Sequence, residues 1–445
     1  MSDANGSPPI GEAQVGVVQA PLPKITTFYS LRSRNYLWFW LAMLSSFAGL
    51  QMNVVARGWL VWELTKSPFK IGLVSFAFGV PLLLFSVFGG AIADRVAKRN
   101  LLQGTQGFQA IVTLAIAILV SAGVIQFWHL VASAVCTGLF FAFDGPTRQA
   151  LIPELVSRRE LLNAIALNSS GMNLTRVLAP TLAGVLLVII GMDGVFYIVV
   201  GCYVAAVAAL SMISPTKRPT ESIGEPDFDP PRASAAGQSH SVAFVRSVWA
   251  DSVEGLRYIR HSSLIMSLLA LAFVPLIFGL PYGNLLPTFA DEVLHVGEFG
   301  FSMLLTVSGA GALIASLSIA SLSDFRRKGM LLLLLALVFG VTLVGFGLSH
   351  SYALSLGILV AVGAGSTGYM TLNTTLLQTH VPQRMTGRVM SIYMMTFALT
   401  PLGTLPIGAL AEEIGVTTAV AAGGVIVILF ILAMLFLRPA LRRLE

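Results

Sequence analysis

Apolar runs of about 20 residues recur from one end of this 445-residue chain to the other. A helix needs about 20 residues to cross a hydrocarbon core of about 30 Å. Charged residues make up only 11% of the chain, too few to cover a globule of this size, whereas soluble domains carry about 25%. Because backbone groups in lipid must be hydrogen-bonded within their own segment, the runs predict an all-α integral membrane protein.

Breaks at charged residues, prolines and glycines divide the sequence into twelve predicted spans. They cover about 38–61, 71–93, 101–122, 128–143, 161–190 and 195–213, then about 264–287, 300–322, 329–348, 352–373, 389–411 and 416–437. Connections after odd-numbered spans hold only two basic residues, Lys66 and Lys70. The other lysines and arginines lie at the termini or in even-numbered connections, apart from Arg57 and Arg176 inside spans. The positive-inside rule therefore places both termini in the cytoplasm.

A polar stretch rich in proline, serine and glycine, 214–243, separates the spans into two sets of six and suits a flexible linker. Apolar side chains at helical spacing in 244–261 predict an amphipathic helix, either a lead-in to the next span or a docking surface. The predicted organisation is an N-terminal tail (1–37), a first six-helix half (38–213), a linker (214–262), a second six-helix half (263–437) and a C-terminal tail (438–445). The first tail lacks an apolar core, so no cleaved signal peptide is expected.

The two halves repeat short motifs at equivalent places. The connection after the second span reads GAIADRVAKR, and the connection after the eighth reads SLSDFRRK. Gln149–Pro153 before the fifth span is matched by Gln378–Pro382 before the eleventh. Equivalent motifs at equivalent positions indicate a duplicated unit.

The Gly-x3-Asp-Arg-x3-Arg spacing of the first connection resembles the signature loop of the major facilitator superfamily. The segment DGPTRQALIPELV, 144–156, resembles the branch that holds drug:proton antiporters and the enterobactin exporter. Pro180 and Gly184 lie in a segment similar to the antiporter motif, with two glycines replaced by alanine. The resemblance implies two pseudo-symmetric halves that alternate access to a central cavity, with no enzymatic activity and no cofactor.

The resemblance also implies how the halves are gated. Asp94 is expected to meet the start of the eleventh span, near Arg388, when the cytoplasmic side is closed, and Asp324 is expected to do the same for the fifth span. The alternative is that both aspartates lie in solvated loops. The predicted gating residues are Gly90, Asp94, Arg95, Arg99, Arg148, Pro180, Gly184, Asp324, Arg326 and Arg388.

Substrate contacts are expected on the spans that the resemblance places around the cavity, with one cation from the fifth span. The predicted substrate-binding residues are Gln51, Asn53, Arg57, Phe140, Phe141, Arg176, Phe278, Tyr282, Asn284, Tyr369 and Asn373. A cation inside a span usually faces protein or water, so Arg57 and Arg176 favour anionic or polar amphipathic substrates. Arg57 lies near the end of its span, and its side chain could instead extend outward to the interface.

Proton coupling requires a group that changes protonation between the two access states. No carboxylate or histidine falls in the middle of a predicted span. The nearest acids are Asp144, at the inner end of the fourth span, and Glu63, just past the outer end of the first. Asp144 corresponds to a membrane-adjacent acid in similar antiporters and is the preferred proton site. Its alternative role is a turn before Gly145 and Pro146, with its side chain paired to Arg148.

Several function classes are excluded. The spans contain no His/Asp cluster, CxxC or serine-centred motif, which argues against an intramembrane enzyme or a metal site, and the chain has no Walker loop. Basic residues are spread over short loops, so no nucleic-acid partner is expected. The leading interpretation is a monomer in a bacterial inner membrane that exports amphipathic drugs, siderophore-like compounds or other metabolites in exchange for protons. Import, facilitated flux, lysophospholipid flipping and a non-transporting receptor or scaffold stay open as alternatives.

Overall fold

The computed structural model describes residues 29–93, 96–157, 160–214, 259–321 and 327–382, together with Arg257 and most of 385–444. Every regular element within these residues is helical, and none is a strand. The predicted all-α class is therefore confirmed. The predicted gating residues Asp94, Arg95, Asp324, Arg326 and Arg388, and the linker up to residue 256, lie outside the described residues.

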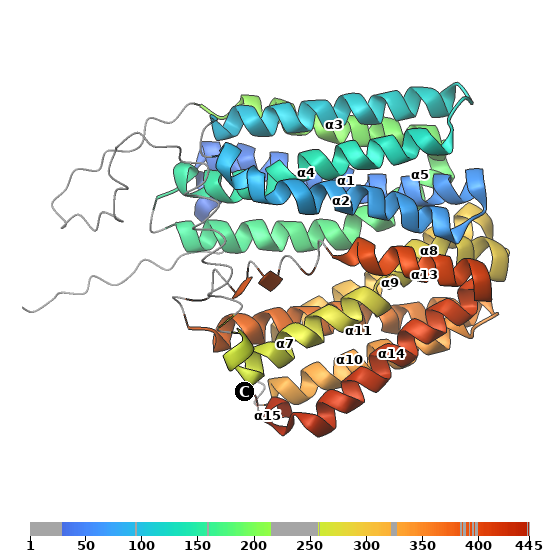
Figure 1. Ribbon diagram of the computed structural model, residues 1–445. Helices are drawn as coiled ribbons and strands as arrows, with labels where there is room; N and C mark the ends of the chain where they lie inside the picture. Colours follow the sequence, from blue (N-terminus) through green and yellow to red (C-terminus); the bar gives the residue numbers. More distant parts are fainter. Residues whose placement is uncertain are drawn as a thin grey trace, which may run out of the picture.

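Five long helices form the first bundle, in the upper part of Figure 1. They are α1 (Arg34–Thr65), α2 (Pro68–Ala93), α3 (Lys98–Ser121), α4 (Phe127–Leu155) and α5 (Leu161–Ser211), preceded by the short η1 (Tyr29–Arg32). α5 contains a break at Gly191, whose φ of 74° lies in the left-handed region that favours glycine. The chain therefore changes direction at Gly191, and the stretch before it can pack separately from the stretch after it.

The second bundle lies below the first in Figure 1. Its elements are α7 (Ser263–Val274), η2 (Pro275–Gly279), α8 (Tyr282–Thr288), η3 (Phe289–Val293), α9 (Gly297–Ser321), α10 (Lys328–Gly347), α11 (Tyr352–His380), α13 (Thr400–Ile414), α14 (Val416–Leu437) and α15 (Pro439–Arg442). The continuous segment from α7 to η3 alternates between α- and π-helix, because Pro275, Pro281 and Pro287 each lack a backbone N–H donor.

Ten helical stretches among the described residues are long and apolar enough to cross a membrane. The sequence predicts twelve. One stretch, Asn163–Ser211, is 49 residues long and includes the Gly191 break, so it is long enough for two crossings. α13 is not among the ten, and the segment before it is only partly described. The count of twelve stays a prediction.

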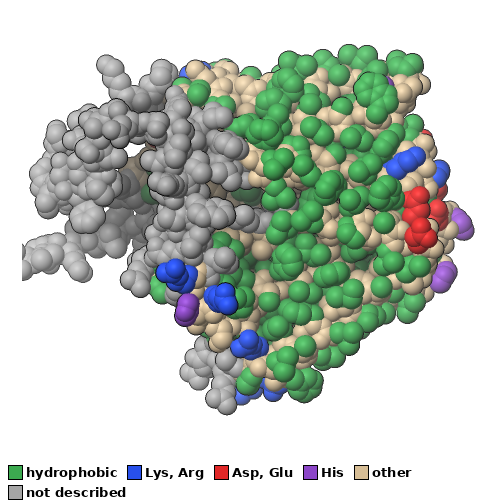
Figure 2. Space-filling model, viewed as in Figure 1, with side chains coloured by type: hydrophobic (Ala, Val, Ile, Leu, Met, Phe, Trp, Pro, Cys, Tyr) green, Lys and Arg blue, Asp and Glu red, His purple; other side chains and the backbone are tan. Residues whose placement is uncertain are grey.

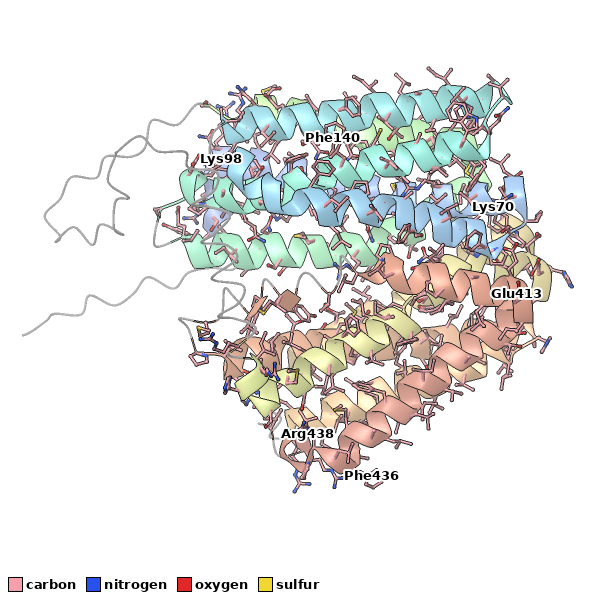
Figure 3. All side chains as sticks on the ribbon, in the orientation of Figure 1. Lys70, Lys98, Phe140, Glu413, Phe436 and Arg438 are labelled. Atoms are coloured by element: carbon pink, nitrogen blue, oxygen red, sulfur yellow. The ribbon has the colours of Figure 1, made fainter. Side chains whose placement is uncertain are left out.

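The two ends of the molecule differ in charge. Lys98 and Arg438 lie at one end and Lys70 and Glu413 at the other, as Figure 3 shows. We call the first the basic end, because the described junctions there carry Arg32, Arg34, Lys98, Arg99, Arg327, Lys328, Arg438 and Arg442. We call the other the acidic end, because it carries Glu63, Asp291, Glu292, Glu298, Glu412 and Glu413, which appear in part as the red cluster in Figure 2. Between the two ends the surface is mostly apolar.

The apolar core shows where the bundles join. One buried cluster contains residues of both bundles, from Trp59 and Ile71 in the first to Phe289 and Phe339 in the second. A separate cluster at the basic end contains only first-bundle residues, among them Tyr36, Leu102 and Leu151. The bundles therefore share one core toward the acidic end, whereas the basic end of the first bundle keeps its own.

Candidate functional site

A polar pocket lies inside the first bundle, between α1, α3, α4 and α5. It is lined by Ser46, Phe47, Leu50, Gln106, Gln109, Phe141, Asp144, Arg148 and Tyr203. We call it the first pocket. Phe141, a predicted substrate-binding residue, lies 6.2 Å from Phe47 and 6.1 Å from Phe78 between ring centroids. The predicted substrate contact Phe141 and the predicted proton site Asp144 therefore lie in the same pocket.

A buried ion pair forms the centre of the first pocket. Asp144 and Arg148 are 3% and 7% exposed, one helical turn apart on α4. Arg148 Nε donates to one carboxylate oxygen, and its Nη2 donates to the other at 3.2 Å. Gln106 of α3 donates to the carboxylate at 2.8 Å, and Arg148 donates to Ser46 of α1 at 2.7 Å. A buried ion pair is tolerated only with such hydrogen bonds, because desolvating the two charges is costly.

The structure corrects the predicted setting of Asp144 and Arg148. The predicted fourth span ends at residue 143, but α4 continues through Gly145 and Pro146 to Leu155. Asp144 is therefore a buried helical residue and not a turn former at the membrane edge. The predicted span, which ends just before Asp144, is therefore too short at this end. The alternative pairing with Arg148 is confirmed, and Arg148 is not a loop residue.

A second polar pocket lies inside the second bundle, on α7, η2, α11 and the segment before α13. It is lined by Ala272, Leu276, Tyr369, Met370, Asn373, Tyr393 and Thr396. We call it the second pocket. Asn373 and Tyr369 are each 1% exposed, and neither the Asn373 amide nor the Tyr369 hydroxyl has a hydrogen-bond partner among the described residues. Tyr369 stacks on Phe339 at 5.7 Å between centroids, so its ring is fixed although its hydroxyl is unpaired.

The lining residues that the two pockets take from α4 and α11 occupy equivalent positions in the two bundles. Gly138 of α4 packs against the backbone of Phe78 on α2, and Gly363 of α11 packs against the backbone of Ser308 on α9, so closely that a Cβ would overlap in both places. Asp144 follows Gly138 at the spacing at which Tyr369 follows Gly363. By the same spacing, Arg148 matches Asn373. The repeat that the sequence motifs indicate thus extends to both pockets.

Arg176 of α5 faces the second bundle. Its side chain is exposed and interacts electrostatically with Tyr393, a lining residue of the second pocket. The adjacent α5 residues Val177 and Thr181 approach Gly309 of α9. Arg176 therefore places a cation of the first bundle beside the second pocket.

Arg57 lies elsewhere, inside the first bundle. It is 6% exposed, with its Nη1 unpaired, and interacts electrostatically with Tyr203. This burial rules out the alternative in which the side chain extends outward to the interface. Asn53 on the same helix is also buried, and Gln51 is half-buried. The two span arginines therefore do not meet in one cavity as expected.

The remaining predicted binding residues are spread over several contacts. Phe140 packs on Phe108 of α3 at 4.2 Å between centroids, away from Phe141. Tyr282 is enclosed by Phe339 and Phe346 and lies 3.3 Å from the Ser308 hydroxyl. Asn284 donates to Thr404 of α13 at 3.5 Å. The backbone of Phe278 lies against Gly423 of α14. These four residues join neither pocket.

Charged and aromatic side chains close the acidic end between the bundles. Trp59 and Trp62 of α1 donate to Glu298 at 3.1 Å and Asp291 at 3.0 Å. Lys66 forms an ion pair with Asp291 at 2.6 Å. Two further donors, the Ser67 hydroxyl at 2.5 Å and the Phe69 backbone at 3.1 Å, meet Glu412 of α13. We call this set of contacts the acidic-end latch.

The other predicted coupling and gating residues lie at several places. Glu63 is exposed at the acidic end of α1, whereas Asp144 lies on α4 in the first pocket. Arg99 donates to the Ser211 carbonyl at 2.9 Å, a contact within the first bundle. Ser302 of α9 donates to the Gly184 carbonyl, so Gly184 lies where the bundles cross, and Pro180 lies one turn earlier on α5. Gly90 lies in α2, which extends to Ala93.

Sequence reasoning missed several pocket residues. Gln106, Gln109 and Tyr203 line the first pocket, and Tyr393 and Thr396 line the second. They fall in spans outside the set that the resemblance places around a cavity. The signal was present, since Gln106 and Gln109 are polar residues one turn apart within an apolar span. Both pockets are closed in this structure: the first has about 10 Å³ of free space and the second has almost none, far less than the roughly 300–1,000 Å³ of a pocket for a drug-sized ligand.

Two apolar helical bundles with a shared core at one end define a multi-pass membrane protein of the major facilitator fold. A solved structure of the nucleoside transporter NupG matches 92% of this chain and 100% of its own length, at a TM-score of 0.65 and 13% identity. A bacterial homologue of the human lysosomal transporter Spinster, solved in an inward-facing and unoccupied conformation, matches 92% of this chain and 96% of its own, at a TM-score of 0.64 and 16% identity.

The family model described as transmembrane secretion effector matches residues 25–445, so the chain belongs to this family of the major facilitator superfamily. The staphyloferrin A transporter of Staphylococcus aureus is 25% identical over 89% of this chain and 94% of its own. The multidrug efflux pump Tap of Mycolicibacterium fortuitum is 24% identical over 91% and 95%. The enterobactin exporter EntS of Shigella flexneri is 25% identical over 79% of each chain. The chain is a transporter of the efflux branch and not an enzyme.

Proposed function

We propose that this transporter exports amphipathic small molecules across a bacterial inner membrane in exchange for protons. The observation that supports coupling most strongly is the buried ion pair of Asp144 and Arg148 in the first pocket. Protonation of Asp144 removes the negative charge and leaves Arg148 buried and uncompensated, which is unfavourable by several kcal/mol. The protonation state of one side chain then biases the arrangement of α1, α3 and α4, whose residues bond the pair.

The proposed orientation has the basic end and both termini in the cytoplasm. In that orientation the acidic-end latch closes the outer side, and the separate core at the basic end suits a state open to the cytoplasm. Export then requires the latch to open and the basic ends of the bundles to approach each other. Gly184, at the crossing of α5 and α9, suits a pivot between the bundles. The proposed working unit is a monomer with this single central pathway.

A transport assay with an imposed pH gradient tests the coupling. An efflux panel of amphipathic dyes and drugs in cells first identifies a transported compound, which is then studied in proteoliposomes. We expect flux that follows the gradient and movement of protons on substrate addition. Asp144→Asn should abolish gradient-driven flux, whereas Glu154→Gln, which removes an exposed acid on the same helix, should not.

The same assay separates the competing functions. Flux that equilibrates without a gradient indicates a facilitator, and accumulation against the proposed direction indicates an importer. Movement of a lysophospholipid between leaflets indicates a flippase. Proton coupling is disproved if a transported substrate neither moves protons nor responds to the gradient.

A further inference from the structure

Two buried polar side chains without partners mark the second pocket as a place for a ligand. The Asn373 amide nitrogen and oxygen and the Tyr369 hydroxyl are all unpaired among the described residues. A buried polar group without a partner is destabilising, so folded proteins rarely retain one without a use for it. An amide both donates and accepts, so its complement is a ligand group that does the same.

The first pocket shows that such groups are not a requirement of the fold. At the positions equivalent to Tyr369 and Asn373, the first bundle carries Asp144 and Arg148, which satisfy each other. The same helical framework is therefore compatible with paired side chains at these two positions, although Gln106 Oε1 and the Tyr203 hydroxyl of the first pocket have no partner among the described residues. Unpaired groups at the equivalent place in the second bundle are a property of that pocket.

The charge beside the second pocket is positive. None of its lining residues is acidic. Arg176 interacts with Tyr393 from the first bundle, while the Tyr393 hydroxyl lies 2.7 Å from the Thr374 hydroxyl. Arg176, a cation of the first bundle, thus acts on a lining residue of the pocket that contains Asn373. Guanidinium groups bind carboxylates and other oxyanions in preference to cations.

We propose that the second pocket binds the polar head of an amphipathic ligand in which an amide or hydroxyl group adjoins an oxyanion. Asn373 and Tyr369 bind the hydrogen-bonding group, and Arg176 binds the anion. The second pocket has almost no free space in this structure, so it admits such a head only when the surrounding helices separate, and the apolar part stays outside the pocket. This subsite rests on the proposed transport of amphipathic molecules and specifies their polar end.

Equilibrium binding tests the subsite with the full chain in lipid nanodiscs and without any gradient. The probe is N-octanoylglycine, which carries an amide beside a carboxylate. Its methyl ester lacks the charge, and octyltrimethylammonium reverses it. We expect the wild type to bind N-octanoylglycine at least tenfold more tightly than either of the other two, measured by calorimetry after correction for partition into empty nanodiscs.

Variants assign the contacts. Asn373→Leu should weaken N-octanoylglycine about tenfold and Tyr369→Phe about threefold, as expected for lost buried hydrogen bonds. Tyr352→Phe is the matched control, because it removes another partnerless hydroxyl at the far end of α11 and should change nothing. Arg176→Gln should bring the acid and its methyl ester to similar affinities.

Equal binding of acid, ester and cation by the wild type would overturn the proposal, as would unchanged binding in the Tyr369→Phe and Arg176→Gln variants. These two substitutions keep the test valid if Asn373→Leu fails to fold. Because no gradient is present, the binding result is independent of proton coupling. Binding without coupled flux refutes only the proposed coupling, and coupled flux without this binding order refutes only the subsite.

Discussion

The first and second pockets are lined by residues at matching positions of α4 and α11, but these residues differ in kind. The first contains opposite charges that are buried and satisfied by each other and by Gln106 and Ser46. The second contains neutral groups that are buried and unsatisfied, with a cation at its edge. Protonation of Asp144 would break the pair in the first pocket, whereas a ligand would supply partners for Asn373 and Tyr369 in the second. This difference is the basis of our proposal that the duplicated halves divide coupling and binding between them.

The largest expected effect comes from removing one charge of the first pocket. Asp144→Ala should destabilise the protein by about 3–5 kcal/mol, because Arg148 stays buried without its partner. The double substitution Asp144→Leu with Arg148→Met should recover most of that loss, since no charge remains to be compensated. Thermal unfolding of the purified variants measures both. Equal destabilisation in the single and double variants would show that the pair is not the source of the effect.

Gly138 and Gly363, which lie at equivalent positions on α4 and α11, should have similar effects on stability when they are substituted. Gly138→Ala and Gly363→Ala each place a Cβ against a neighbouring backbone, at Phe78 and Ser308. We expect each to cost about 1–3 kcal/mol, the usual effect of overpacking. Gly104→Ala is a suitable control, because nothing lies near its Cβ position. A loss at one pocket glycine and none at the other would break the equivalence of the bundles.

A substitution in the second pocket should change the free energy of unfolding in the opposite direction from a substitution in the first. Asn373→Leu replaces a buried amide that has no partner among the described residues by an apolar side chain of similar size. We expect a gain of about 1 kcal/mol in stability together with weaker ligand binding, a combination typical of residues kept for function. Unfolding scans beside the binding assay check it. A loss of stability comparable to that of Asp144→Ala would mean that Asn373 is structural.

The smallest effect belongs to the acidic-end latch. The Lys66 and Asp291 side chains are 57% and 35% exposed, so their ion pair contributes at most about 1 kcal/mol. Asp291→Asn should therefore leave stability nearly unchanged while increasing the fraction of molecules with the acidic end open. Double electron–electron resonance between spin labels on the two bundles measures that fraction. No change in the distance distribution would mean that the latch does not hold this end closed.

Hydropathy alone predicts the fold class and the position of most helices, because lipid leaves the backbone few options. Hydropathy does not predict the ends of helices correctly where polar residues are paired with each other inside the bundle. Asp144 and Arg148 look like the end of a span in the sequence, since their pairing across one turn depends on α4 continuing past them. Gly191 shows the opposite case: two spans that the sequence separates join into α5, whose helical conformation is interrupted at this residue.

The candidate sites were only partly predictable, for a related reason. The sequence predicts Asn373 and Tyr369 as binding residues because they are polar residues on the tenth predicted span, which the resemblance places beside the cavity. It does not predict Gln106 and Tyr393 as pocket residues, because a residue lines a pocket only if its face of the helix meets the neighbouring helices. Arg57 and Arg176 look alike in the sequence, and only packing separates a cation inside one bundle from a cation between two.

The most direct test of the proposed division of labour is proton release on substrate binding. The purified protein is placed in weakly buffered solution with a pH indicator, and the compound identified by the efflux panel is added. We expect the wild type and Glu154→Gln to release protons when the solution is acidic enough to protonate Asp144 before the compound is added. Asp144→Asn should bind the compound without releasing them, and Asn373→Leu should do neither at the same concentration. Undiminished release from Asp144→Asn would contradict the assignment of coupling to the first pocket.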